Sequence, residues 1–218
     1  MREKTAPAPD RVSPRSDPQQ ERSRVRHQAL LDAAEAIIGE VGAEGLKMRE
    51  VARRANLPIA SVYHYFPSAP ALIRAVVEQM HADLRAILLQ GVARASARED
   101  VAAPERTLIA VIDAAADFME SRPHLPAIWG AMRAAPDLRG LDVADTQANA
   151  RLLAPAVRSL LPKAPPEDVE ALCLVVIEGV SAVLTLACDL APGKRAQVRE
   201  MLKGFVGAAI GGLMEQYR

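Results

Sequence analysis

Aromatic residues and cysteines are scarce in this sequence of 218 residues. Phe, Trp and Tyr make up only 3% of it, and its hydrophobic half comes mainly from Ala, Leu and Val. Those residues suit closely packed helices better than sheets, so we expect an all-α protein of about nine helices. Cys173 and Cys188 fall in one apolar helical segment, where the helix rise separates them by roughly 22 Å. That distance excludes a disulfide between them.

Net charge is also absent, because 27 Lys and Arg balance 27 Asp and Glu. Total charge therefore does not indicate nucleic-acid binding, so any evidence for it has to come from where the basic residues lie along the chain. The N-terminus lacks the apolar core of a secretory signal, so we expect a cytoplasmic protein. Residues 171–188 have the length of a membrane span, but the central carboxylate of Glu178 is costly in lipid. We expect no membrane association.

Residue patterns typical of catalysis and of metal or cofactor binding are missing as well. The sequence has no His, Cys, Asp and Glu cluster at metal spacing, no nucleophile–base pairing and no glycine-rich phosphate loop. We therefore expect no metal, no cofactor and no enzymatic activity. An enzyme with N-terminal helices that merely look like a binding module is the alternative.

Hydrophobic periodicity divides the chain into three parts. Residues 1–21 are rich in Pro, Ser, Arg and Asp without apolar periodicity, which predicts a disordered arm. Residues 22–84 are predicted to form a first domain of helices, and residues 85–218 a second one. A long helix that begins after Ser68 connects the two.

Two short helices are predicted inside the first domain, over residues 47–55 and 58–65. Asn56 tolerates a left-handed backbone, so it suits the tight turn between them. Residues 45–66 read GLKMREVARRANLPIASVYHYF, and P-S-x-P-A-L follows. With the preceding helix, this stretch resembles the DNA-binding domain of the TetR family of transcription regulators over residues 24–77. The remainder resembles the family only in helix layout and length.

The resemblance implies an N-terminal three-helix helix-turn-helix domain joined to a helical ligand-binding and dimerisation domain. In such a domain the second short helix enters the major groove, and the first braces it. Ile59 and Ala60 are compact enough to touch thymine methyl groups, and Ser61 can bond a base edge or a phosphate. The residues expected to contact DNA are Arg24, Arg26, Lys47, Met48, Arg49, Pro58, Ile59, Ala60, Ser61, Tyr63 and His64.

Several of these positions have alternatives or depart from the family pattern. Tyr63 and His64 offer polar tips to phosphates, but either ring could instead pack the small domain. Lys47 stands where members usually have a phosphate-binding Thr and keeps that role as a point charge. Arg53 and Arg54 are expected to form a solvated helix face rather than to contact bases.

The family layout implies a ligand pocket and a dimer interface in residues 85–218. The candidate ligand-binding residues, each of which could instead be structural, are Phe118, Met119, Trp129, Met132 and Glu178. The last two helices are expected to pair with their copies, because one is apolar nearly all round and the other is rich in glycine. The candidate interface residues are Val183, Leu186, Phe205, Ile210 and Leu213.

These observations predict a sequence-specific, homodimeric DNA-binding transcription regulator. We expect a repressor that a small molecule releases from a near-palindromic operator in double-stranded DNA, because a twofold protein binds a twofold site. A ligand-independent or activating regulator of the same fold is the alternative, since it shares the first half of the chain. The ligand, the operator and the regulated genes stay open.

Overall fold

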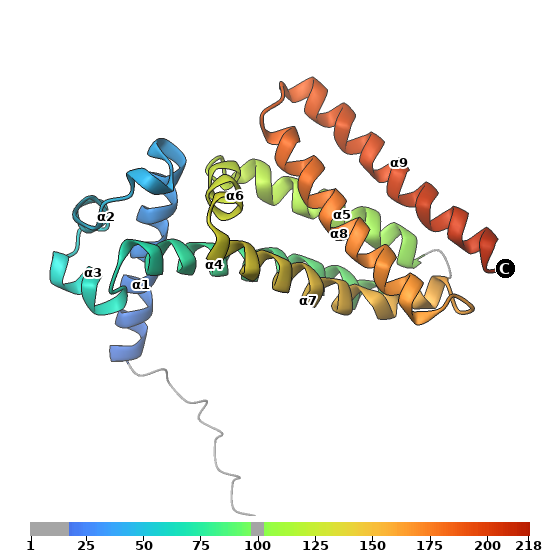
Figure 1. Ribbon diagram of the computed structural model, residues 1–218, viewed down its shortest axis with the longest axis horizontal. Helices are drawn as coiled ribbons and strands as arrows, with labels where there is room; N and C mark the ends of the chain where they lie inside the picture. The colour runs from blue at the N-terminus through green and yellow to red at the C-terminus, as the bar shows by residue number, and fades with distance from the viewer. Residues whose placement is uncertain (1–17, 97–102) are drawn as a thin grey trace, which may run out of the picture.

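The computed structural model describes residues 18–96 and 103–218. This part of the chain is built from α-helices and one 3-10 turn, η1 (Ala43–Gly45), with no strand, so the expected all-α class is confirmed (Figure 1). The nine α-helices within these ranges are α1 (Pro18–Val41), α2 (Met48–Arg54), α3 (Ile59–Tyr65), α4 (Ala69–Ser96), α5 (Ala103–Ser121), α6 (Leu125–Ala134), α7 (Pro136–Leu160), α8 (Pro166–Cys188) and α9 (Pro192–Gln216).

The predicted N-terminal arm requires a correction at its end. α1 begins at Pro18, so residues 18–21, which were expected to belong to a disordered arm, are helical. Proline suits a first helical turn, and Glu21 in that turn bonds Arg24 with 2.7 Å between Oε1 and Nη2. Apolar periodicity does not indicate this turn, because its residues are polar. Residues 1–17 of the predicted arm lie outside the described ranges.

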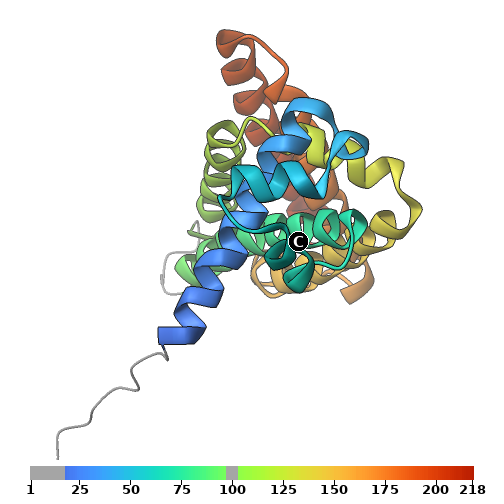
Figure 2. The same cartoon turned by 90° about the vertical axis from the view of Figure 1, so that its left-hand side faces the viewer.

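Helices α1, α2 and α3 surround one apolar core at one end of the molecule (Figures 1 and 2). Leu30, Ile37 and Ile38 share one stripe of α1 because they are seven and eight residues apart. They meet Val51 of α2 and Val62 of α3, and each of these five side chains is at most 2% exposed. This core holds α2 and α3 in place against α1.

Two residues with positive φ set the connections of α2 and α3. Gly42, with φ 75°, follows α1, and Asn56, with φ 52°, forms the turn between α2 and α3. Asn adopts this backbone region more readily than most residues, so the predicted turn is confirmed. The N–H of Leu57 then donates to the carbonyl oxygen of Ala52 over 3.0 Å, which closes the end of α2.

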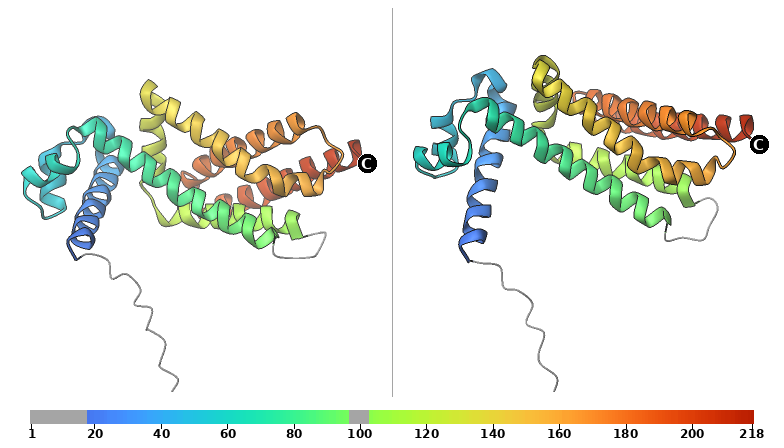
Figure 3. Two further views of the ribbon diagram at one scale, coloured as in Figure 1. Left: turned by 90° about the horizontal axis from the view of Figure 1, so that it is seen from below. Right: turned by 60° about the horizontal axis from the view of Figure 1, so that its bottom comes forward.

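Helix α4 joins this N-terminal unit to the rest of the molecule. Ser68 caps it, because its Oγ accepts a hydrogen bond from the N–H of Ala71 over 3.3 Å. In the first half of α4, the buried Leu72 and Val76 belong to the core beside α1. The second half runs beside α5 and α7 (Figure 3). The predicted domain boundary near residue 85 thus falls inside one continuous helix.

The C-terminal unit consists of α5 to α9 and the second half of α4. α7 packs against α4 and α8, and α5 packs against α4, α8 and α9. α8 and α9 run antiparallel along one side of the unit (Figures 1 and 3). Among the described residues, α8 is the one helix long and apolar enough to cross a membrane. A single such helix is weak evidence of insertion, because packed helices of bundles have the same composition.

Candidate nucleic-acid interface and ligand cavity

The outer face of α3 is available to a partner. Ile59 is 39% exposed and Tyr63 52%, and they lie four residues apart on one stripe of the helix. Ala60 and His64 form the adjacent exposed stripe, and Ser61 is half-buried. Pro58, which precedes α3, is exposed as well. The structure therefore leaves Ile59, Ala60, Tyr63 and His64 exposed along one side of α3, with Ser61 half-buried at its edge.

Exposed cationic side chains lie on α1 and at the start of α2. Lys47 at the N-terminus of α2 is exposed, as are Arg49 and Arg26, and none of the three forms an ion pair with a described residue. Arg24, by contrast, already has Glu21 as its partner. Exposed cations without a carboxylate partner among the described residues are the groups that phosphate contacts require.

Met48 is corrected. Its side chain is 8% exposed and belongs to the core of the N-terminal unit, so it is not available for the DNA contact that we expected. The reason is helical geometry, because Met48 shares the inner stripe of α2 with Val51 and Ala52, three and four residues further on.

Arg53 and Arg54 form ion pairs with carboxylates. Nη2 of Arg53 lies 2.6 Å from Oε1 of Glu50, and Nη2 of Arg54 lies 2.5 Å from Oε2 of Glu40. Hydrogen bonds from Arg53 and then Arg54 lower the pKa of Glu50 to about 2. This arrangement fits the expected solvated face.

Tyr65, which the sequence left ambiguous, faces α1. Its hydroxyl lies 3.0 Å from Oγ of Ser23, and the His27 ring packs edge-on against it with 5.9 Å between centroids. The same imidazole lies 5.1 Å from the ring of Phe66. Tyr65 therefore ties α3 to α1. Ser23 and His27 carry no sequence signal that would have predicted this role.

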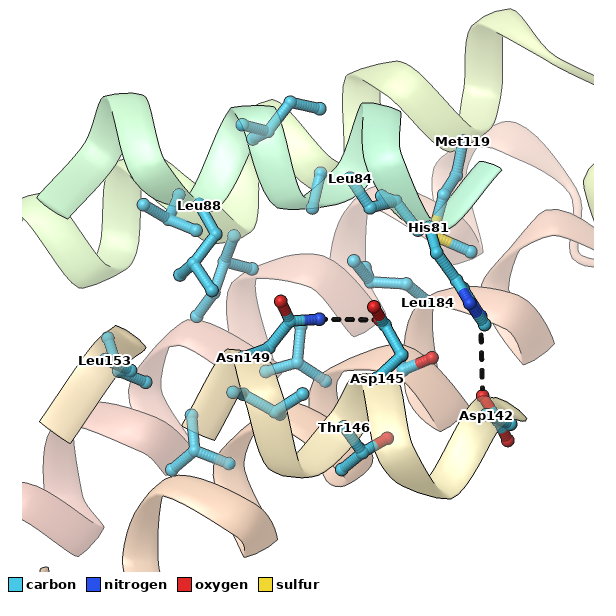
Figure 4. A pocket seen from close by; sticks show the side chains of 18 of the residues that line it. His81, Leu84, Leu88, Met119, Asp142, Asp145, Thr146, Asn149, Leu153 and Leu184 are labelled. Atoms are coloured by element: carbon cyan, nitrogen blue, oxygen red, sulfur yellow. Dashed lines mark hydrogen bonds and ion pairs between the residues drawn. The ribbon is translucent and has the colours of Figure 1, made fainter. Parts of the chain in front are cut away.

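A cavity lies between helices of the C-terminal unit. Its volume is about 130 Å³, which is below the usual range for the sites of drug-sized ligands. Most of the wall is apolar and comes from α4, α5, α7 and α8, with Leu84, Leu88, Ile112, Leu153 and Leu184 as examples (Figure 4). Of the residues expected to bind a ligand, Met119 and Trp129 line it.

The other three candidate ligand residues are elsewhere. The ring of Phe118 lies under Arg122, with 4.7 Å from Cζ to the ring centroid, and Met132 is fully buried in the core without lining the cavity. Glu178 is exposed on α8 and lines a neighbouring hollow that shares Asp142 and Thr146 with the cavity. The rotation of each helix, which the apolar pattern does not determine, keeps these three side chains out of the cavity wall.

One wall of the cavity is polar, and sequence reasoning missed it. Asp142, Asp145 and Asn149 face it from α7, opposite His81 of α4 (Figure 4). Burial lowers the pKa of His81. The spacing of the α7 residues, three and four apart, was the available signal, since it places them on one helix face. Among the described residues no three His, Cys, Asp or Glu side chains form a metal-ligand set.

The outer face of α8 and α9 is apolar and exposed. Val175 is 64% exposed, Leu186 60%, Met201 71% and Phe205 68%. The small residues on the same exposed face are Gly179, Ala182, Gly204 and Ala208. Monomeric proteins rarely expose such continuous apolar patches, which typically mark interaction sites. We call this surface the α8–α9 face.

One of the five candidate interface residues requires correction. Leu186 and Phe205 lie on the α8–α9 face, but Ile210 is 2% exposed and belongs to the core of its own chain. It follows Leu202 and Val206 at four-residue intervals along the inner stripe of α9. Val183 and Leu213 are half-buried and pack against the same core.

Family models match most of the chain. Residues 30–76 match the model of bacterial regulatory proteins of the tetR family, and residues 102–210 match the tetracyclin repressor-like C-terminal domain. The HTH-type transcriptional regulator BetI of Agrobacterium fabrum is 27% identical over 165 residues, which cover 73% of each chain. BetI of Burkholderia pseudomallei is 29% identical over 162 residues, 72% of this chain and 80% of that one.

Solved structures of the same architecture are more distant in sequence. A TetR-family regulator from Mesorhizobium loti superposes with a TM-score of 0.70 over 90% of this chain and 98% of its own, at 15% identity. One from Streptomyces coelicolor has a TM-score of 0.62 over 86% and 99%, at 23% identity. These two show the fold, and the two family models cover both units of it. The chain therefore belongs to the TetR family of DNA-binding transcription regulators.

Proposed function

We propose that this chain is a homodimeric repressor that grips a near-palindromic operator through α2 and α3. A small molecule in the cavity between α4, α5, α7 and α8 releases that DNA. Family membership, the exposed face of α3 and the exposed cations on α1 and at the start of α2 support the operator role. Such a protein acts in the cytoplasm, where its operator is, and it needs no enzymatic activity.

The observation that carries ligand release is the continuity of α4. Leu72 and Val76 anchor its first half in the core of the N-terminal unit, whereas Leu84 and Leu88 in its second half line the cavity. A ligand that displaces the second half therefore moves the N-terminal unit as well. The two copies of α3 in a dimer must be about 34 Å apart to enter successive major grooves, so a small rotation disfavours the operator. The ligand acts by its differential affinity for the two arrangements.

The α8–α9 face supplies the dimer contact in this proposal. Pairing α8 and α9 with their copies would form a four-helix interface and remove the exposed apolar side chains from water. The small residues Gly179, Ala182, Gly204 and Ala208 would let the helix backbones approach closely.

Selection of DNA from a random pool tests the operator role. The proposal expects an enriched sequence with twofold symmetry, because each protomer presents one copy of α3. Enrichment of an asymmetric single site would contradict the homodimer, and enrichment of nothing would contradict sequence-specific recognition.

Ligand release predicts a thermodynamic linkage. Any compound that lowers operator affinity must bind the DNA-free protein more tightly than the DNA-bound protein, by the same factor. Calorimetric titration of both forms with one compound measures this factor. Equal affinities for both forms would instead favour the ligand-independent regulator.

Tyr63 is expected to hold a phosphate. Its side chain is half-exposed on the outer face of α3, so Tyr63→Phe should weaken operator binding by about 0.5 to 1.5 kcal/mol, the net contribution of one hydrogen bond. The loss should be similar for all operator variants, because phosphate contacts carry no sequence information. Fluorescence titration against wild-type and mutated operators measures it, and the melting temperature should hardly change.

Two further variants serve as controls for Tyr63→Phe. Lys47→Ala should weaken binding to all DNA and reduce the slope of affinity against salt by about one. Ser61→Ala should instead change the preference among operator variants if its hydroxyl contacts a base edge. A Tyr63→Phe protein that binds DNA normally but unfolds several kcal/mol more easily would place the hydroxyl in the core.

A further inference from the structure

The polar wall of the cavity presents hydrogen-bond acceptors to an otherwise apolar space. Asp142, Asp145 and Asn149 come from one face of α7, and two carboxylates and one amide oxygen are all acceptors. The hydroxyls of Thr146 and Ser181 can serve either way. A ligand head that lies against this face of α7 has to bring donors.

Asn149 places the most specific requirement on a ligand. The residue is 8% exposed, and its Nδ2 donates to Oδ2 of Asp145 over 2.7 Å. Because an ionised carboxylate only accepts, this bond determines which end of the amide is which and turns Oδ1 away from Asp145 (Figure 4). Oδ1 is buried and has no hydrogen-bond partner. A buried acceptor in that state is unfavourable, so a donor from a ligand would be bound there.

The wall also keeps one negative charge without a counterion. Asp145 is neutralised, since Arg85 pairs with its Oδ1 and Asn149 with its Oδ2. The nearest basic group to Asp142 is Nε2 of His81, 3.7 Å from its Oδ1. Burial lowers the pKa of His81 below its usual value, so that imidazole is mainly neutral at pH 7. The ion pairs of the described residues give Asp142 no partner other than this imidazole.

A second hollow next to the cavity does not change this balance. It shares Asp142 and Thr146 with the cavity. Its charged lining residues are Arg133, Arg139, Asp142 and Glu178, so two basic and two acidic side chains balance. The inner wall thus decides the charge of the ligand head.

We infer that the ligand of this cavity is an amphipathic primary or secondary amine, with its apolar body between the leucine side chains and its protonated head at Oδ1 of Asn149, where Asp142, about 10 Å away along α7, attracts its charge. The inference rests on the proposed function, because it names the chemistry of the proposed ligand. An anion would meet Asp142 without a free cation. A quaternary ammonium has no N–H for Asn149, and Trp129 is the one Phe, Tyr or Trp among the described lining residues, so no aromatic cage replaces that bond.

Four probes with the same n-octyl body test this inference on the full-length protein. They are octylamine, octyltrimethylammonium, octanol and octanoate, and the fluorescence of Trp129, the single tryptophan of the chain, reports occupancy. Octylamine should bind at least about tenfold more tightly than each of the others, because it alone offers both charge and N–H donors. Equal or tighter binding of any other probe, or no binding of octylamine, would overturn the inference.

Matched variants locate the amine head. Asp142→Asn should weaken octylamine by about tenfold and leave octanol unchanged, and Asn149→Leu should also weaken octylamine while keeping the shape of the side chain. Asp117→Asn removes the same charge from the same unit at a side chain that is 70% exposed and pairs with Arg199, so it should change nothing. Thermal melting verifies that each variant is folded. Equal effects of Asp142→Asn and Asp117→Asn would mean a general charge effect and overturn the placement.

Operator binding by the same protein separates this inference from the proposed function. If octylamine fills the cavity but operator affinity does not fall, the ligand class is supported and ligand release is wrong. If another compound releases the operator while octylamine does not bind, ligand release is supported and the ligand class is wrong.

Discussion

Phe205→Asp should convert the protein into a folded monomer that binds its operator more than a hundredfold more weakly. Phe205 is 68% exposed in the single chain, so a carboxylate there costs the protomer little. In the proposed dimer the same carboxylate would be buried in an apolar interface without a partner, which costs about 3 to 5 kcal/mol. Analytical ultracentrifugation measures the loss of association. Operator titration measures the loss of affinity that follows when two half-sites are no longer bound jointly.

Ile210→Asp is the matched control on the same helix. Ile210 is 2% exposed and points into its own protomer, so this variant should unfold the chain rather than separate two folded chains. The melting temperature distinguishes the two results. If Phe205→Asp keeps the mass of a dimer, the α8–α9 face is not the interface. Leu186→Asp, at 60% exposure on α8, should repeat the effect of Phe205→Asp.

The parts of this fold that the sequence predicted are those with local chemical causes. Asn56 indicated the turn between α2 and α3 because few residues adopt a positive φ, and Ser68 indicated the start of α4 because its hydroxyl caps a helix. The stripe of apolar residues in α1 was wide and regular, so its inner face followed from spacing. Such signals depend on neighbours along the chain, which a single sequence contains.

The rotation of the last two helices could not be predicted in the same way. α8 is apolar nearly all round, and α9 interleaves glycine and alanine with large residues, so periodicity does not distinguish the face toward the protomer from the α8–α9 face. Ile210 and Phe205 are equally apolar, yet one is 2% and the other 68% exposed. Only the packing of α9 against α8 and α5 separates them.

The polar wall of the cavity illustrates the opposite difficulty. Asp142, Asp145 and Asn149 lie on one face of α7, and a polar face of a helix usually faces solvent. The packing of α4 and α8 against α7 places this face at the cavity, where Asn149 is 8% exposed. The DNA contacts of α3 and the ligand contacts of the cavity stay predictions that the experiments above test.

Arg122→Glu should uncouple the cavity from the operator. Arg122 follows α5, and its Nη2 lies 2.9 Å from Oδ2 of Asp83 in α4, while its Nη1 lies 3.7 Å from Oε2 of Glu35 in α1. Burial raises the pKa of Glu35, and Arg122 is the strongest influence that lowers it. Since Met119 of the cavity wall precedes Arg122 by one helical turn, this arginine links the cavity to α4 and to α1 of the N-terminal unit.

α1 also packs closely against His124 at Gly39, because a Cβ added to Gly39 would lie 1.9 Å from Nδ1 of that histidine. In Arg122→Glu three carboxylates would meet at this joint. The lost ion pairs and the new repulsion should weaken the contact by about 1 to 2 kcal/mol. The ligand-induced loss of operator affinity should then shrink by about tenfold, with little change in ligand affinity of the DNA-free protein. Calorimetry of the free protein and operator titration with and without ligand measure the two quantities.

A second substitution separates coupling from damage. Adding Asp83→Arg to Arg122→Glu reverses the pair and restores an attraction across the α4–α5 junction, so the double variant should regain much of the ligand effect. Asp83→Arg alone places two arginines together and should impair it. If Arg122→Glu retains the full ligand effect, the signal does not pass through this joint, and the continuity of α4 alone has to carry the movement from the cavity to α3.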